Sequence, residues 1–222
     1  MITLHHCMSA RSFRPLWALE ELGLPYELRM LPFPPRAHAR SYLELNPLGT
    51  VPLLVDAGVR LTESVAICQY LAARHSPGGL DVGLDEPDFG AYLNHLHYGE
   101  ATLTFPQSLV LRYTHFEPPE RRVPQVAQDY EKWFLARLKP LEPLLTTQDH
   151  LCAGRFTAAD ISVGYALMLA EHLGLGDRLP PAVRAYGQRL QARPGHQRAL
   201  AAQVAAATAQ GVSTLPAPDL RP

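Results

Sequence analysis

The stretch NPLGTVPLLVD, from Asn46 to Asp56, places a proline at the start of a short β-branched and apolar run. Proline has no backbone N–H, so it interrupts the hydrogen bonding of an internal strand. The bond before a proline favours trans by only about 0.5–1 kcal/mol. A cis bond between Val51 and Pro52 would direct the N–H and C=O of Val51 outward, where a peptide-like ligand can bind as an added strand. The alternative is an ordinary edge-strand proline.

Strands and helices alternate around this stretch, and Gly and Pro residues separate them. The expected elements are a strand at 2–6, a helix from about 12 that stops at 22–25, a strand at 26–31, a loop leading to a weak helix at 40–45, a hairpin of 51–55 and 59–62, and a helix at 63–75. This order predicts a small mixed α/β sheet covered by helices.

A linker rich in Gly, Pro and Asp follows at 76–88 and is typical of a domain boundary. The rest of the chain reads as helical, with helices expected at 89–111, 126–145 and 156–173 and two further short ones. Thr157 and Asp160 have the spacing of a capping box and are assigned to folding. We therefore expect an α/β domain at 1–78, an all-helical domain at 86–212 and a flexible tail at 213–222.

Composition narrows the class of protein. The formal net charge is −1, with 47% hydrophobic and 18% charged residues, so nothing favours nucleic acid or an anionic membrane as partner. No apolar run approaches the roughly 20 residues of a membrane span, and the N-terminus lacks a signal-peptide layout. Cys7, Cys68 and Cys152 are too few and too far apart for a disulfide framework or a dithiol centre. We expect a cytoplasmic protein without a metal cluster.

Two segments carry side chains suited to a small charged ligand. In TESVAI, Ser64 precedes a helix whose N-terminus suits a carboxylate, and Glu63 could accept from an ammonium group. Together they fit an α-amino-acid head, although Ser64 could instead cap its helix and Glu63 could be solvated.

In CMSARSFR, a helix beginning near Ser12 would lower the pKa of a thiol placed at its N-terminus. The hydroxyl of Ser9 or Ser12 could donate a hydrogen bond to that thiolate. The alternative for either serine is helix capping.

Four segments together resemble the cytosolic glutathione S-transferases: SARSFRPLWALEELGLPYEL, LNPLGTVPLLVD, LTESVAICQYLA and GRFTAADISVGYAL. The first is most similar to the start of bacterial and fungal members. The resemblance covers essentially the whole chain in order and spacing. It implies a thioredoxin-like N-terminal domain, an all-α C-terminal domain, a homodimer, and glutathione as co-substrate.

The resemblance also assigns residues. Val51, before cis Pro52, would pair with the cysteinyl backbone of glutathione, and Glu63 with Ser64 would hold the γ-glutamyl head. Relatives hold the glycine carboxylate partly through a Lys or Gln at the position that Thr50 occupies here. Basic residues nearby could compensate, and three remain open: Arg36, His38 and Arg40.

The thiol-activating residue departs from the family pattern. The positions where relatives carry tyrosine, cysteine or serine hold other residues here: His5 or His6, Arg11 and Ala10. Ser9 is the first choice for the activating hydroxyl and Ser12 the second.

The leading hypothesis is an enzyme in which bound glutathione attacks an electrophilic carbon, a peroxide or a disulfide. A hydrophobic electrophile would occupy a pocket on the long helix, whose lining residues could equally be interdomain or dimer core: Tyr98, Phe105, Leu109, Arg112 and Tyr113. One alternative is a non-catalytic binding or interaction module that has lost activation, as Ala10 would indicate. A weaker one is a structural partner without a glutathione site.

Overall fold

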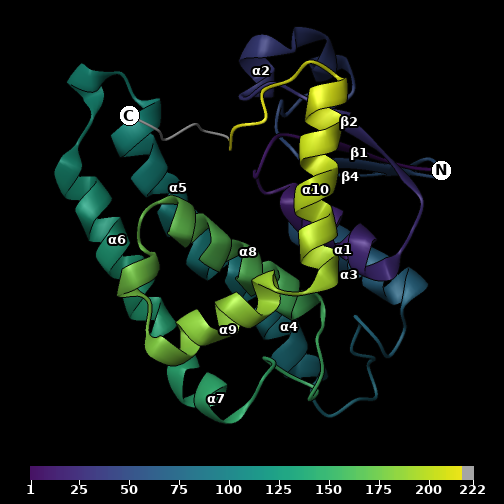
Figure 1. The fold of residues 1–222 in the computed structure, drawn as a ribbon, viewed down its shortest axis with the longest axis vertical. Coiled ribbons are helices and arrows are strands. Elements are labelled where there is room, and N and C mark those ends of the chain that lie inside the picture. Colours follow the sequence, from purple (N-terminus) through teal and green to yellow (C-terminus); the bar gives the residue numbers. More distant parts are fainter. Residues whose placement is uncertain (217–222) are drawn as a thin grey trace. The chain divides into compact units, whose positions relative to one another are not determined.

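The computed structural model describes residues 1–216 (Figure 1). Its contacts divide the chain into two compact units. The first joins Met1–Ser76 to the segment from Ala192 onward, and the second is Pro77–Gln191. Most of the tail predicted at 213–222 lies outside the described residues.

The first unit contains a four-stranded mixed sheet in the order β2-β1-β3-β4. Its strands are β1 (Ile2–His6), β2 (Tyr26–Met30), β3 (Leu53–Asp56) and β4 (Val59–Leu61). β1 pairs with β2 in parallel and with β3 antiparallel, and β3 and β4 form the predicted hairpin. Ala57 and Gly58 form its turn, both with positive φ, as a two-residue hairpin loop requires. The predicted mixed α/β sheet is confirmed.

The helices of this unit are α1 (Phe13–Leu22), α2 (Pro35–His38), the 3₁₀ helix η1 (Arg40–Glu44), α3 (Ser64–His75) and α10 (Pro194–Ala209). Phe13, Leu16 and Trp17 bury α1 in the core. The segment before residue 40, expected to be a loop, contains α2. Its prolines are compatible with a helix because Pro35 stands in the first turn, where a proline gives up no helical hydrogen bond. The weak helix after it is 3₁₀ rather than α.

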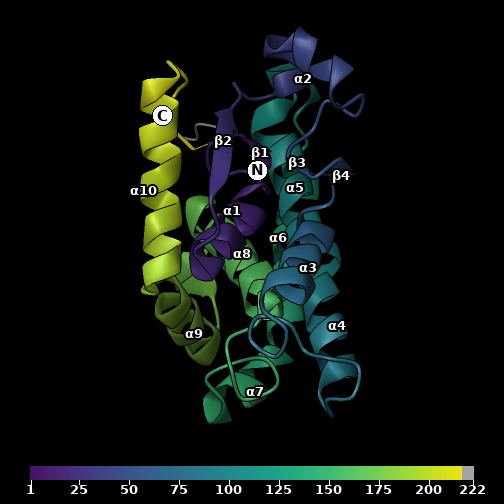
Figure 2. The same ribbon diagram turned by 90° about the vertical axis from the view of Figure 1, so that its right-hand side faces the viewer.

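α10 was expected in the second domain, yet it packs in the first unit against α1 and β2 (Figure 2). The Arg193 guanidinium binds both carboxylate oxygens of Glu21, at 2.8 and 3.0 Å. The His196 ring meets Trp17 edge-on, with 4.8 Å between centroids. At Gly195, a Cβ atom would lie 2.4 Å from the Glu21 side chain. Glycine therefore permits the close approach of the two helices.

The second unit is helical throughout its regular structure. Its elements are α4 (Phe89–His97), the π-helix η2 (Tyr98–Thr104), α5 (Phe105–Leu111), the π-helix η3 (Arg112–Phe116), the 3₁₀ helix η4 (Pro119–Arg121), α6 (Pro124–Leu138), α7 (Leu141–Thr147), α8 (Ala158–His172), the 3₁₀ helix η5 (Gly176–Arg178) and α9 (Pro181–Gln191). The helix predicted at 89–111 is interrupted by a π turn. The one predicted at 126–145 divides before Leu141, since Pro140 cannot donate a helical hydrogen bond.

α8 is buried along nearly its whole length. The capping box predicted at its start is present: the Thr157 hydroxyl accepts from the Ala159 N–H at 3.3 Å, and Asp160 accepts from the Thr157 N–H at 2.8 Å. Gly99 of η2 lies so close to α8 that a Cβ atom would be 2.3 Å from the Ser162 Oγ. Among residues 1–216, no helix has the length and apolar character to cross a membrane.

Candidate active site

The loop before β3 holds Val51 outside the sheet's pairing. The Val51–Pro52 bond is cis, as predicted. The last pair of β1 with β3 is His5 with Leu53, so the Val51 backbone lies beyond the paired residues. The carbonyl of Thr50 accepts hydrogen bonds from Tyr42 Oη and Asn46 Nδ2, both at 2.8 Å. These two hydrogen bonds hold the loop at Thr50.

The start of α3 differs from the prediction in one respect. Glu63, with extended backbone, occupies the N-cap position, and Ser64 is the first helical residue. The Ser64 hydroxyl does not cap the helix; it accepts a hydrogen bond from Arg14 Nη1 at 3.2 Å. The Arg14 side chain is fully buried. A buried guanidinium and a helix N-terminus therefore combine positive potential at Ser64, beside the exposed Glu63.

Arg14 contacts the candidate site residue Ser64, although the sequence did not single it out. It stands in the first turn of α1, between the buried residues Phe13 and Leu16. A charged residue on the apolar face of a short helix is a usable signal, because a buried charge requires a partner. Its partner, Ser64, lies 50 residues further along the chain.

The two candidate serines have different surroundings. Ser9 is partly buried and has a left-handed backbone, with φ of 53°. Its N–H donates to Gln203 Oε1 at 2.9 Å. Ser12 is fully buried, and its hydroxyl lies 2.7 Å from His6 Nδ1 and accepts from the Cys7 N–H at 3.4 Å. Ser12 occupies the N-cap position of α1, but its side chain makes no capping hydrogen bond, because its hydroxyl is engaged with His6.

Burial sets the protonation of the groups around this turn. It lowers the pKa of His6 to about 4, so the ring is neutral at pH 7. It raises the pKa of the Cys7 and Cys68 thiols to about 12 and that of Cys152 to about 11. All three cysteines are free and buried. None has the lowered pKa of a reactive thiol.

The three basic residues considered for the glycine carboxylate lie on two consecutive short helices, α2 and η1. Arg36 and His38 lie on α2 and Arg40 begins η1, and all three are exposed. Thr50 is exposed as well, and it is the Thr50 carbonyl that accepts the hydrogen bonds holding the loop. The geometry does not single out one basic side chain. Within residues 1–216, no three His, Cys, Asp or Glu side chains come together as metal ligands.

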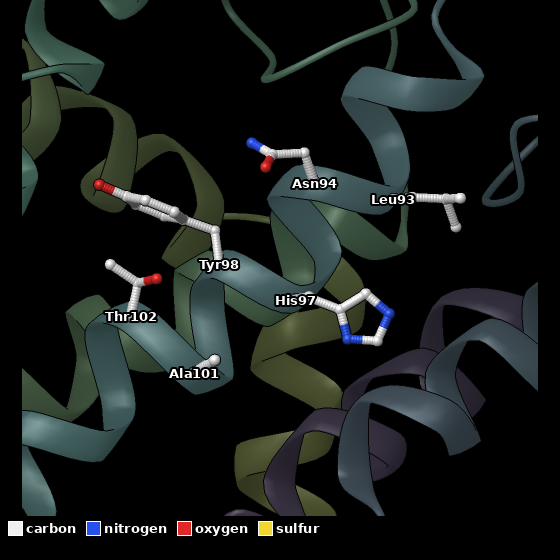
Figure 3. A pocket seen from close by; sticks show the side chains of 6 residues that line it. All are labelled: Leu93, Asn94, His97, Tyr98, Ala101 and Thr102. Atoms are coloured by element: carbon white, nitrogen blue, oxygen red, sulfur yellow. The ribbon is translucent and has the colours of Figure 1, made fainter.

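In the second unit, a groove of about 360 Å³ lies on α4 and η2 (Figure 3). It is lined by Leu93, Asn94, His97, Tyr98, Ala101 and Thr102. Of the five residues expected to form a second-substrate pocket, this groove contains Tyr98. His97 and Tyr98 project from opposite sides of the helical segment in Figure 3.

The other four expected pocket residues continue along α5 and η3. Phe105 is 54% exposed, Leu109 and Tyr113 are partly buried, and Arg112 pairs with Glu117 at 2.9 Å. A π-helix has more residues per turn than an α-helix, so η2 shifts the face that later residues present. The α-helical spacing on which the predicted stripe rests therefore does not hold along the whole segment from Tyr98 to Tyr113.

Known proteins resemble this chain over both units. A family model of the glutathione S-transferase N-terminal domain matches residues 8–74. Glutathione S-transferase 3 of Schizosaccharomyces pombe is 37% identical over 103 residues, which is 46% of this chain and 43% of that protein. Glutathione S-transferase 4 of Zea mays is 32% identical over 189 residues, which is 82% of this chain and 83% of that protein.

Among solved structures, a sphingomonad glutathione S-transferase complexed with glutathione superimposes with a TM-score of 0.78. It is 26% identical, and the match covers 90% of this chain and 98% of that one. The fold is thus a thioredoxin-like unit with a helical remainder. The chain belongs to the glutathione S-transferase family.

Proposed function

We propose that this protein is a glutathione transferase that binds glutathione on its first unit and activates the thiol for attack on a second substrate. The observation that carries the proposal is the start of α3, where buried Arg14 holds Ser64 at a helix N-terminus. This arrangement favours a carboxylate. The sphingomonad relative is solved with glutathione, a tripeptide with a free α-amino-acid head.

In this proposal each part of glutathione has its own protein group. The first turn of α3 and the Ser64 hydroxyl bind the γ-glutamyl carboxylate, and Glu63 accepts from its ammonium group. Val51, beyond the ladder pairs of β3, pairs with the cysteinyl backbone in strand-addition fashion. The glycine carboxylate lies toward Thr50, with Arg36, His38 or Arg40 as its cation.

The chemistry follows from placing the cysteinyl sulfur near Ser9. A hydrogen bond from the Ser9 hydroxyl favours the thiolate and lowers the thiol pKa, and the thiol proton passes to solvent. The sulfur electron pair then forms a bond to an electrophilic carbon, whose leaving group departs with its own bonding pair. With a peroxide or a disulfide, the same thiolate forms a bond to one oxygen or sulfur atom, and the O–O or S–S bond breaks with its electron pair leaving on the other atom.

The second substrate, assembly and location are finer parts of the proposal. A small hydrophobic electrophile would lie along η2 and α5, which contain Tyr98, Phe105 and Leu109. The protein would act as a homodimer, which sedimentation would detect. Three free, buried cysteines fit a reducing compartment such as the cytoplasm, where fractionation should find the protein.

Calorimetry with glutathione and turnover with a panel of electrophiles test the proposal. Glu63→Gln should weaken glutathione binding about tenfold, since an amide cannot attract the ammonium group as a carboxylate does. Glu120→Gln, at an exposed position of the second unit, is the matched control and should bind like the parent. No binding by the parent protein would refute the proposal. Binding without turnover on any electrophile would instead support the alternative that Ala10 indicates, a non-catalytic binding module.

A further inference from the structure

Gln203 on α10 lies against the turn that carries Ser9. Its side chain is 2% exposed. Oε1 of its amide is 2.9 Å from the Ser9 nitrogen and 2.9 Å from His6 Nε2. The Nε2 atom is 3.4 Å from the Ser9 Oγ. The side-chain amide of Gln203 thus contacts both the backbone and the hydroxyl of Ser9.

The backbone N–H of Ser9 fixes how this amide is oriented. A backbone N–H can only donate, so the Gln203 atom facing it must be the oxygen. His6 Nε2, bonded to the same oxygen, must therefore carry a proton, and His6 Nδ1 is an acceptor. The Ser12 hydroxyl, 2.7 Å away, consequently donates to Nδ1. Every group in this network has one consistent role.

Ser9 needs such support because of its backbone conformation. Its φ of 53° lies in the left-handed region, which residues other than glycine rarely adopt. A side chain is held there only where its surroundings determine the conformation, and such residues cluster at functional sites. The Gln203 amide supplies a hydrogen bond to each polar group of Ser9 that faces α10.

We propose that Gln203 is a positioning residue of this transferase: it holds the Ser9 turn so that the Ser9 hydroxyl meets the sulfur of bound glutathione. The inference rests on the proposed function and adds α10 to the site. Gln203 should affect activation of the thiol but not affinity for the tripeptide, because its hydrogen bonds go to Ser9 and His6 and not to the proposed binding residues Val51, Glu63 and Ser64.

The test compares Gln203→Met and Gln203→Glu with Gln210→Met. Methionine has nearly the length of glutamine but forms none of the three contacts. Glutamate keeps the acceptor for Ser9 and His6. Gln210 lies at the end of the same helix and bonds to β2 instead, accepting from the Met30 N–H at 2.9 Å and donating to the Leu28 carbonyl at 2.8 Å. It therefore controls for weaker docking of α10.

We expect Gln203→Met to accelerate hydrogen exchange of the Ser9 amide and to lower kcat about tenfold. The pKa of the bound glutathione thiol, followed by thiolate absorbance, should rise by about one unit. The calorimetric Kd for glutathione should stay within about twofold of the parent's. Gln203→Glu should fall between Gln203→Met and the parent, and Gln210→Met should match the parent in kcat and thiol pKa.

Parental kcat and thiol pKa in both Gln203 variants would overturn the inference, even if exchange at Ser9 quickened. Equal losses in Gln210→Met would overturn it too, since docking of the helix would then explain them. If Gln203→Met does not fold, Gln203→Glu decides by the same two readouts. A parent protein that binds no glutathione would refute the proposed function instead, and calorimetry on the parent shows this first.

Discussion

Ser9 and Ser12 stand three residues apart, and their hydrogen bonds give them different roles. Ser12 is fully buried and bonded to His6, so its hydroxyl stabilises the turn. Ser9 is only partly buried and has a left-handed backbone. Of the two hydroxyls, that of Ser9 is the one we propose to meet the glutathione sulfur.

Replacing Ser9 separates its hydroxyl from its backbone. Ser9→Ala and Ser9→Gly both remove the hydroxyl, so both should raise the pKa of the bound thiol and lower kcat alike. Glycine tolerates the left-handed φ, so Ser9→Gly should be more stable than Ser9→Ala by about 1 kcal/mol. Urea unfolding and thiolate titration measure the two effects. A kcat that followed stability rather than the hydroxyl would contradict the role of Ser9.

Ser12→Ala is the companion variant. It leaves His6 Nδ1 without its buried donor, which should cost about 1–3 kcal/mol of unfolding free energy. The bound thiol should keep a pKa near that of the parent. A raised thiol pKa in Ser12→Ala would instead support Ser12 as the activating residue.

Gly49 shows how one small residue shapes the loop before β3. It has a φ of 61°, and a Cβ atom there would lie 2.8 Å from Arg36 Cβ and 2.9 Å from Leu43 Cδ2. Gly49→Ala should therefore destabilise the fold through both backbone strain and contact with α2. Gly23 has a φ of 62° with nothing within 4 Å of such a Cβ, so Gly23→Ala measures the backbone cost alone.

We expect Gly23→Ala to lose about 1–2 kcal/mol and Gly49→Ala to lose more, by about 1–3 kcal/mol. Glutathione binding should weaken in Gly49→Ala only, because Gly49 precedes Thr50 and Val51. Equal losses in the two variants would mean that the loop can move away from α2.

At the scale of elements, α8 is fixed at its start by one carboxylate. Asp160 is fully buried and accepts from the Thr157 N–H at 2.8 Å, the Leu151 N–H at 3.1 Å and the Tyr186 hydroxyl at 2.7 Å. It therefore ties the helix to the preceding loop and to α9 as well as capping it. Burial raises the pKa of both Asp160 and Tyr186.

The two cap residues should consequently differ in their cost. Thr157→Ala should lower the unfolding free energy by about 1 kcal/mol through the lost cap. Asp160→Ala should lower it by about 3 kcal/mol, since it leaves several buried donors without an acceptor. Thr147→Ala, at an exposed position of α7, is the control. Equal costs for Thr157→Ala and Asp160→Ala would show that the bonds to Leu151 and Tyr186 add nothing.

At the scale of the whole molecule, His6 links stability to pH. Its pKa is about 4 in the fold because of burial, against 6.5 for an exposed ring. Between these values the unfolded chain binds a proton that the folded chain does not. The unfolding free energy therefore falls as the pH falls from 6.5 to about 4, by a total on the order of 3 kcal/mol.

Urea unfolding at intervals across this range measures the effect. His5, His95 and His115 also have a pKa lowered by burial and act in the same direction. His6→Gln removes the His6 contribution and leaves theirs, so its profile should be flatter than the parent's. Two profiles of equal slope would show that His6 does not carry this dependence.

The sequence by itself determined most of the local structure. Short runs of β-forming residues placed the strands, Gly and Pro placed the ends of elements, and Thr157 with Asp160 marked the start of α8. Pro52 at the start of an apolar run indicated an unusual backbone conformation where the strand begins. These signals depend on neighbours along the chain, where backbone geometry and capping act over a few residues.

Only the tertiary structure decided how distant residues combine. Arg14 contacts Ser64, which lies 50 residues further along the chain. Gln203 contacts His6 and also Ser9, from which it is separated by 194 residues. No periodicity links such residues, because their pairing depends on which helix packs where. The placement of α10 in the first unit, rather than with the helices before it, has the same origin. Buried polar groups require partners, and Gln203 on α10 supplies them to His6 and Ser9.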